Sequence, residues 1–224
     1  MLLGGDLSKN LTHAVKGAGS LNAAFGAAFG PAAILALFVF IKEIASLAIE
    51  VGNAENEFMK VTGASEEFAR SLSNSFIQTR KFGASMGETS EAMVRLREDF
   101  TDFTFQNKDT RESLIETATL LSKMGMSSSD FAKSIQFMTK AMSMNSKAAA
   151  QQMLNLEKFA EELEVSPSKI SSEFAGATGT LAKFGDQGVE TFKRLQVASK
   201  ITSLEMNRIL SITEKFDTFE GAAT

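Results

Sequence analysis

The chain contains no cysteine, no tryptophan and no tyrosine, and only two prolines and one histidine in 224 residues. Without cysteine, disulfide bonds and thiolate chemistry are excluded, and a reducing compartment is permitted. All aromatic residues are phenylalanine, which has no polar atom, so we expect these rings to fill helix interfaces rather than to recognise a ligand. So few prolines leave long stretches free to form helices.

The charge balance gives no indication of nucleic-acid binding. There are 23 basic and 27 acidic residues, and the net charge is −4. A protein that binds nucleic acid through phosphate contacts carries a basic patch, which this composition does not indicate. The length allows one or two domains with ample core.

Helix ends and helix starts recur along the chain in one pattern. In KMGMSSSDFAKSI (123–135), Gly125 can take the left-handed conformation that ends a helix. Ser127 can cap the next helix, and Asp130 lies where a capping box needs a carboxylate. The same pattern predicts caps at Ser85 with Glu88, at Ser166 with Pro167 in the first helical position, and at Thr202 with Glu205.

The four predicted caps at 85, 127, 166 and 202 are separated by 42, 39 and 36 residues. Weaker starts fall between or before them, at Ser65, Asp109, Ser146 and Asp186. Helices therefore start about every twenty residues and pairs of helices about every forty, which favours repeated helical hairpins. The alternative is an ordinary helical bundle whose helices are of similar length.

Apolar residues follow helical spacing from residue 65 onward, and no alternation typical of strands persists. Because each stripe stops at a cap, one continuous coiled coil across 65–220 is disfavoured. The predicted fold is all-α, with short amphipathic helices in successive hairpins. The stripes are Met93, Leu96, Phe100 and Phe103; Leu114, Ala118 and Leu121; Phe131, Ile135, Met138 and Met142; and Met153, Leu156, Ala160 and Leu163.

The first part of the chain differs from the rest. Residues 1–20 are predicted to form a Gly/Ala-rich arm, 21–52 an apolar helical segment, and 53–224 the hairpin region. Residues 21–41 carry no charge and, as one helix, are long enough to cross a membrane. Pro31 divides the run, however, and the ten apolar residues after it suit a buried core helix. Burial against protein and insertion at some stage both remain open.

Catalytic, cofactor and metal chemistry are not indicated by any motif. His13 has no neighbouring ligand at metal-binding spacing, and neither a phosphate loop nor a Gly-x-Ser-x-Gly elbow occurs. The acidic group Glu161, Glu162 and Glu164 beside Lys158 is typical of a solvated helix face. We therefore expect no enzyme, no cofactor, and no catalytic or metal-binding residue.

Several segments resemble the N-terminal part of phage tail tape measure proteins. They are EVGNAENEFMKVTGAS, KFGASMGETSEAM, LLSKMGMSSSDFAKSI and ELEVSPSKISSEF, which follow a Gly/Ala-rich start and an apolar helix. The resemblance covers roughly residues 20–224. It rests on structural motifs and transfers no catalytic residue. Tape measure proteins are usually several times longer, which suggests that this chain is a fragment.

This resemblance implies a structural protein that lies in the lumen of the tail tube, sets tail length during assembly and leaves ahead of the genome. It implies partners among tail tube proteins, baseplate or tail-tip proteins and tail assembly chaperones, together with a homo-oligomer. It also implies contact of residues 21–41 with the host membrane, no sequence-specific nucleic acid, and a place in the virion after assembly in the host cytoplasm. The alternatives are a membrane-active helical bundle of the pore-forming or toxin kind and a helical interaction scaffold.

Overall fold

The described residues of the computed structural model, 46, 49–60, 62–206 and 208–210, form helices and no strand. The all-α prediction is therefore confirmed for this part of the chain. The chain divides into two compact units, Met1–Arg70 and Ser71–Thr224. In order, the elements are α2 (Glu66–Thr79), η1 (Arg80–Phe82), α3 (Met86–Asp99), η2 (Phe103–Phe105), α4 (Lys108–Lys123), α5 (Ser128–Ala141), α6 (Ser146–Glu162), α7 (Pro167–Leu181), η3 (Ala182–Gln187) and α8 (Gly188–Thr202).

The predicted arm (1–20) and most of the predicted apolar segment (21–52) lie outside the described residues. In the first unit, residues 49–60 are helical. The N–H of Gly63 donates to the carbonyl of Met59 (2.9 Å), and the carbonyl of Ser65 accepts from the N–H groups of Phe68 and Ala69 at the start of α2. The weaker start predicted at Ser65 is thus confirmed.

A four-residue connection, here called the left-handed turn, joins helices at six places. Its first residue is the last residue of a helix or the C-cap that follows it, and its second has a positive φ and is exposed. Its third is apolar and at least half-buried, and its fourth precedes the next helix. The second residue needs the left-handed conformation, which explains glycine at three of the six positions. The turns are 62–65, 82–85, 124–127, 142–145, 163–166 and 202–205, with φ of 63, 81, 96, 54, 51 and 57° at Gly63, Gly83, Gly125, Ser143, Glu164 and Ser203.

Two of these turns show why the chain reverses there. After α4, the N–H of Met126 donates to the carbonyl of Leu121 (2.9 Å), and the N–H of Gly125 to that of Ser122 (3.1 Å). After α6, Val165 and Glu164 repeat these two bonds with Ala160 and Glu161. This pair of bonds satisfies carbonyls that the end of a helix leaves open.

The predicted caps at Ser85, Ser127 and Ser166 are confirmed. Each side chain accepts the backbone N–H three residues later, and Glu88 returns a bond to complete the capping box at Ser85. These backbone and hydroxyl donors and the Lys123 ammonium, 3.0 Å away, lower the pKa of Glu88 to about 2. Asp130 does not return such a bond to Ser127, since its side chain is one methylene shorter.

The cap predicted at Thr202 is wrong, although the chain does break there. Thr202 is the last residue of α8, and its hydroxyl donates back to the carbonyl of Ala198 (2.7 Å). Ser203 is left-handed, and the carbonyl of Glu205 accepts the first bonds of the next helix. The weaker starts predicted at Asp109, Ser146 and Asp186 were also displaced, because Asn107 caps α4, Asn145 caps α6, and α8 begins at Gly188 without a side-chain cap.

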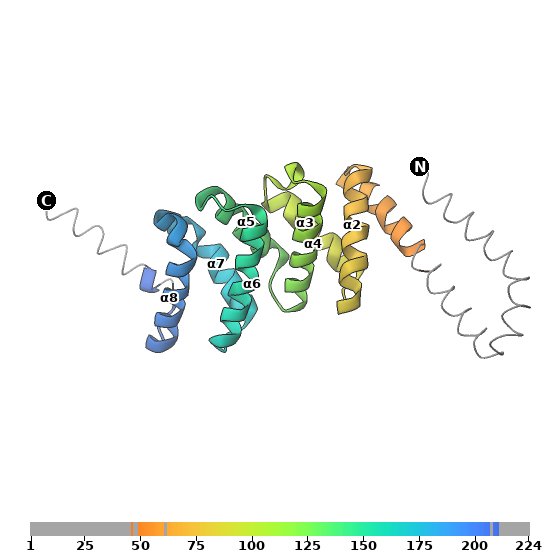
Figure 1. Ribbon diagram of the computed structural model, residues 1–224. Helices are drawn as coiled ribbons and strands as arrows, with labels where there is room; N and C mark the ends of the chain where they lie inside the picture. The colour runs from red at the N-terminus through yellow and green to blue at the C-terminus, as the bar shows by residue number, and fades with distance from the viewer. Residues whose placement is uncertain (1–45, 47–48, 61, 207, 211–224) are drawn as a thin grey trace, which may run out of the picture. The chain divides into compact units, whose positions relative to one another are not determined.

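The second unit is a stack of helical hairpins around a continuous core. Consecutive helices from α3 to α8 pack on each other, and α3 also contacts α5, α4 contacts α6, and α5 contacts α7. This pattern places α3, α5 and α7 in one layer and α4 and α6 in the other, as in helical repeat proteins. In Figure 1 the hairpins α3–α4, α5–α6 and α7–α8 follow one another in chain order.

The predicted apolar stripes form the core of this stack. All their members are buried except Leu163, which is half-buried. Phe100 and Phe103 belong to the connection after α3 rather than to the helix itself. Phe137, Phe174 and Phe192 continue the core across three helices, with ring centroids 5.8 and 5.0 Å apart in edge-to-face pairs.

Candidate functional site

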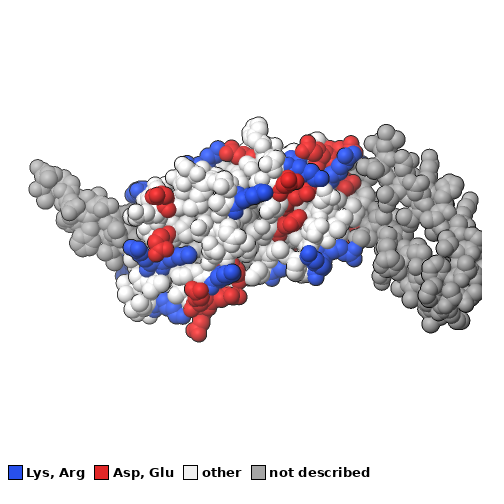
Figure 2. Space-filling view, viewed as in Figure 1, with Lys and Arg blue, Asp and Glu red and all other residues white. Residues whose placement is uncertain are grey.

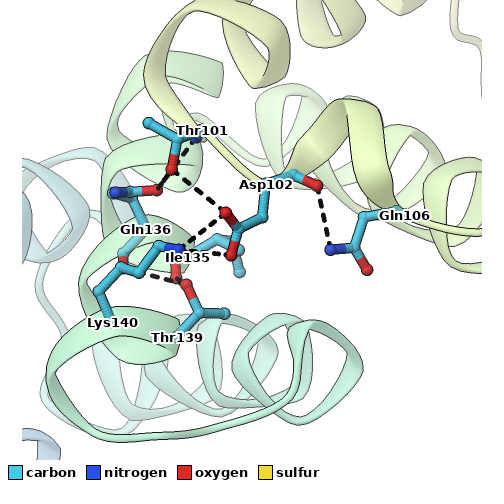
Figure 3. A network of polar contacts seen from close by, with 7 residues as sticks. All are labelled: Thr101, Asp102, Gln106, Ile135, Gln136, Thr139 and Lys140. Carbon is cyan, nitrogen blue, oxygen red and sulfur yellow. Dashed lines mark hydrogen bonds and ion pairs between the residues drawn. The ribbon is translucent and has the colours of Figure 1, made fainter.

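Polar side chains hold the connection between α3 and α4 against α5 (Figure 3). The backbone N–H and the hydroxyl of Thr101 both donate to Oε1 of Gln136 at 3.1 Å. The ammonium of Lys140 lies 2.7 and 2.6 Å from the two carboxylate oxygens of Asp102, whose carbonyl accepts from Gln106. Because these groups satisfy one another, we interpret the cluster as a clamp between hairpins rather than as a ligand site.

The connection held by this clamp exposes one aromatic ring. In η2, Phe103 is fully buried, whereas Phe105 is 85% exposed. Phe105 therefore presents an apolar ring to solvent, and aromatic residues, phenylalanine among them, are enriched in protein interfaces. Other large apolar side chains that are exposed include Ile77, Phe82, Met124 and Ile201.

An open groove of about 480 Å³ lies between α2 and α4, lined by Asn74, Ile77, Gln78, Glu112 and Glu116. Asn74 donates to Oε1 of Glu112 at 2.9 Å. Desolvation raises the pKa of Glu116, the neighbouring Glu112 raises it further, and Lys81 opposes both. The groove is polar and carries the carboxyl groups of Glu112 and Glu116.

Two buried charged residues were missed by sequence reasoning. Arg111 is 1% exposed, and its Nε donates to the hydroxyl of Ser71 at 3.0 Å. Glu157 is 5% exposed; burial raises its pKa, and Glu161, one turn later, raises it further. Their burial could have been predicted from their spacing. Arg111 lies three residues before Leu114 and Glu157 four residues after Met153, so both fall on the apolar stripes.

The acidic group after Lys158 is solvated, as predicted. Glu161, Glu162, Glu164 and Lys158 are exposed. Figure 2 shows side chains of both signs interspersed over the face in view, with one acidic group at its lower edge. An interspersed surface of this kind does not form the single-sign field that attracts a nucleic acid.

Within the described ranges, no group of three or more His, Cys, Asp or Glu side chains could hold a metal ion. His13 lies outside them. Of the helices described, none is long and apolar enough to cross a membrane. The predicted apolar residues 21–41 lie outside the described residues.

Comparisons with protein-family models, with curated proteins and with solved structures found no match to this chain.

Proposed function

We propose that this chain is part of a phage tail tape measure protein, a structural protein that lies in the tail tube and sets tail length during assembly. The observation that carries the proposal is the recurrence of the left-handed turn. Together with the connections η2 and η3, it divides 62–205 into short helices of 14 to 17 residues. Such a chain has a regular construction along its length, and a measuring protein needs length rather than a catalytic centre.

The physical properties of these helices support this role. Helical rise is fixed at about 1.5 Å per residue, so the number of residues defines a length. Helices of this size are marginal on their own, so they can unfold when the chain leaves the tube. A net charge of −4 gives the chain little affinity for the DNA that follows it.

The proposed partners are the tail tube, baseplate or tail-tip proteins and tail assembly chaperones, with further copies of the chain in the tube. Phe105 and the groove between α2 and α4 are the surfaces that we assign to these contacts. The proposed location is the virion, after assembly in the host cytoplasm.

Removing one hairpin from the gene in its phage tests the proposal. Deleting residues 127–165 joins Met126 to Ser166 and so preserves the left-handed turn, with one N-cap serine replaced by another. If the 39 residues span the tail as a single helix, tails shorten by about 58 Å. If the hairpins stay folded and stacked along the tube, tails shorten by about 10 Å, one helix-packing distance.

Averaged tail lengths from electron micrographs measure the change, and duplicating residues 127–165 provides the matched control. Duplication should lengthen the tail by the amount that deletion removes. The variant proteins must retain their helical content, which circular dichroism verifies. Tails of unchanged length in both variants would contradict a measuring role for this segment.

Host-membrane contact through residues 21–41 is the second part of the proposal. Leu37→Lys places a charge in the apolar run and should weaken association with lipid vesicles by about 3 kcal/mol. The hairpins from Ser65 onward should stay folded. If vesicle association is unchanged and the soluble protein aggregates instead, the segment is a core helix.

A further inference from the structure

The α7–α8 hairpin contains weaker helical elements than the hairpins before it. Gly176 and Gly179 lie inside α7, both are exposed, and a Cβ at either position would meet no atom within 4 Å. No close packing therefore requires glycine there. Each glycine lowers the stability of the helix relative to alanine, since it leaves the unfolded chain more freedom.

The connection and the start of α8 add to this weakness. The connection is the 3₁₀ segment η3, interrupted at Gly185 with φ 53° and ψ −129°. Helices α3 to α7 each begin with a serine or asparagine whose side chain accepts a backbone N–H. Helix α8 begins at Gly188 after Gln187, which makes no such bond. Its first turn therefore lacks a stabilising contact that the other five possess.

The polar contacts with the neighbouring hairpin also differ between the two parts of the stack. Three side-chain links join the α3 end and its connection to α5: Asp99 with Ser129 (2.7 Å), Thr101 with Gln136, and Asp102 with Lys140. Between α8 and α6, the ammonium of Lys193 lies over the ring of Phe159, 5.6 Å from its centroid, and Lys200 reaches the end of α6. The Lys200 ammonium donates to the carbonyl of Leu163 and lies 3.6 Å from Oε2 of Glu164, whose side chain is 88% exposed. An ion pair this exposed contributes little to stability.

Within the hairpin, by contrast, the two helices are well joined. The side-chain amide of Gln196 in α8 donates to Glu173 in α7. The rings of Phe174 and Phe192 pack edge to face at 5.0 Å, and both are fully buried. Phe137 of α5 is the aromatic contact of this pair with the hairpin before it.

We infer that α7 and α8 open together as one unit, at a lower free energy than α3 to α6, so that the stack unfolds from its α7–α8 side. Local opening of this kind is expected where helices are intrinsically weak. The contacts between Gln196 and Glu173 and between Phe174 and Phe192 keep the two helices together as they leave α5 and α6. This order of opening belongs to the folded chain itself, whether or not it acts in a phage tail.

Hydrogen exchange on the full chain, followed by mass spectrometry under native conditions, tests the inference. Amides of α7 and α8 should exchange at one common rate, at least tenfold faster than those of α3 to α6. Gly176→Ala and Gly179→Ala should each slow exchange in both helices about twofold to fivefold.

Ser85→Ala is the matched variant in the first hairpin. Loss of this cap should speed exchange in α3 and α4 about fivefold and leave α7 and α8 unchanged. Equal protection of α7–α8 and α3–α6 in the unmodified chain would overturn the inference. Equal acceleration of exchange in every helix by Ser85→Ala would also overturn it, because the stack would then open as one cooperative unit. Different exchange rates for α7 and α8 would overturn it as well.

Discussion

Replacing Glu164 by glycine should stabilise the protein. Glu164 is the left-handed residue of the turn between α6 and α7, with φ 51°. A side chain in this conformation costs about 1–2 kcal/mol, which glycine avoids. Glycine also increases the conformational entropy of the unfolded chain, which offsets about 0.4–1 kcal/mol of the gain. The exposed ion pair with Lys200 is lost with little effect, since Glu164 is 88% exposed. We expect a net gain of about 1 kcal/mol.

Urea denaturation followed by circular dichroism measures this gain, and two control variants isolate its cause. Glu91 is exposed inside α3, and Glu91→Gly should destabilise by about 1 kcal/mol, because a helix interior disfavours glycine. Glu164→Ala removes the carboxylate but keeps the left-handed cost, and should change stability by less than about 0.5 kcal/mol. If Glu164→Gly lowers stability as Glu91→Gly does, the reasoning from backbone conformation is refuted.

Four further predictions concern caps and carboxylates. Ser85→Ala should lower the unfolding free energy by about 1 kcal/mol through loss of the capping box, as urea denaturation can measure. Thr202→Ala should change the unfolding free energy by less than about 0.5 kcal/mol, because this exposed residue ends α8 and is not the N-cap of the next helix. Glu157→Gln should stabilise the protein near neutral pH and have little effect below the ordinary glutamate pKa. The raised pKa of Glu157 means that its contribution to stability is present at low pH and is lost as pH rises through the folded-state value. Glu88→Gln should destabilise the protein near neutral pH and have little effect near pH 2. Because the pKa of Glu88 is about 2, its carboxylate stabilises the folded protein above pH 4.5, and this contribution is lost as pH falls toward 2. Unfolding free energies measured across pH test both predictions, and a stability change of the opposite sign in either variant would contradict the one that concerns it.

The sequence alone determined the helices and most of their ends. Glycine at 125 and serine at 127 act through their own backbone and side chain, so the turn and the cap could be predicted without knowing what lies nearby. The stripes predicted the buried side of each helix for the same reason, because a 3.6-residue period defines a face. The sequence also contained the signal for Arg111 and Glu157, as charges at stripe positions.

Tertiary structure decided which faces meet and where ambiguous ends fall. Around 202–205, threonine, serine and glutamate all suit a helix boundary, and the choice was made by packing: Met206 is buried, and the hydroxyl of Ser199 donates to the carbonyl of Leu204 (2.6 Å). The bond between Lys140 and Asp102 joins residues 38 positions apart, and no local rule specifies it. Glu164 adopts a conformation that its side chain disfavours, because the helices on either side hold the turn there. Local chemistry therefore determined where the chain turns, and contacts between hairpins determined how the turns are stacked.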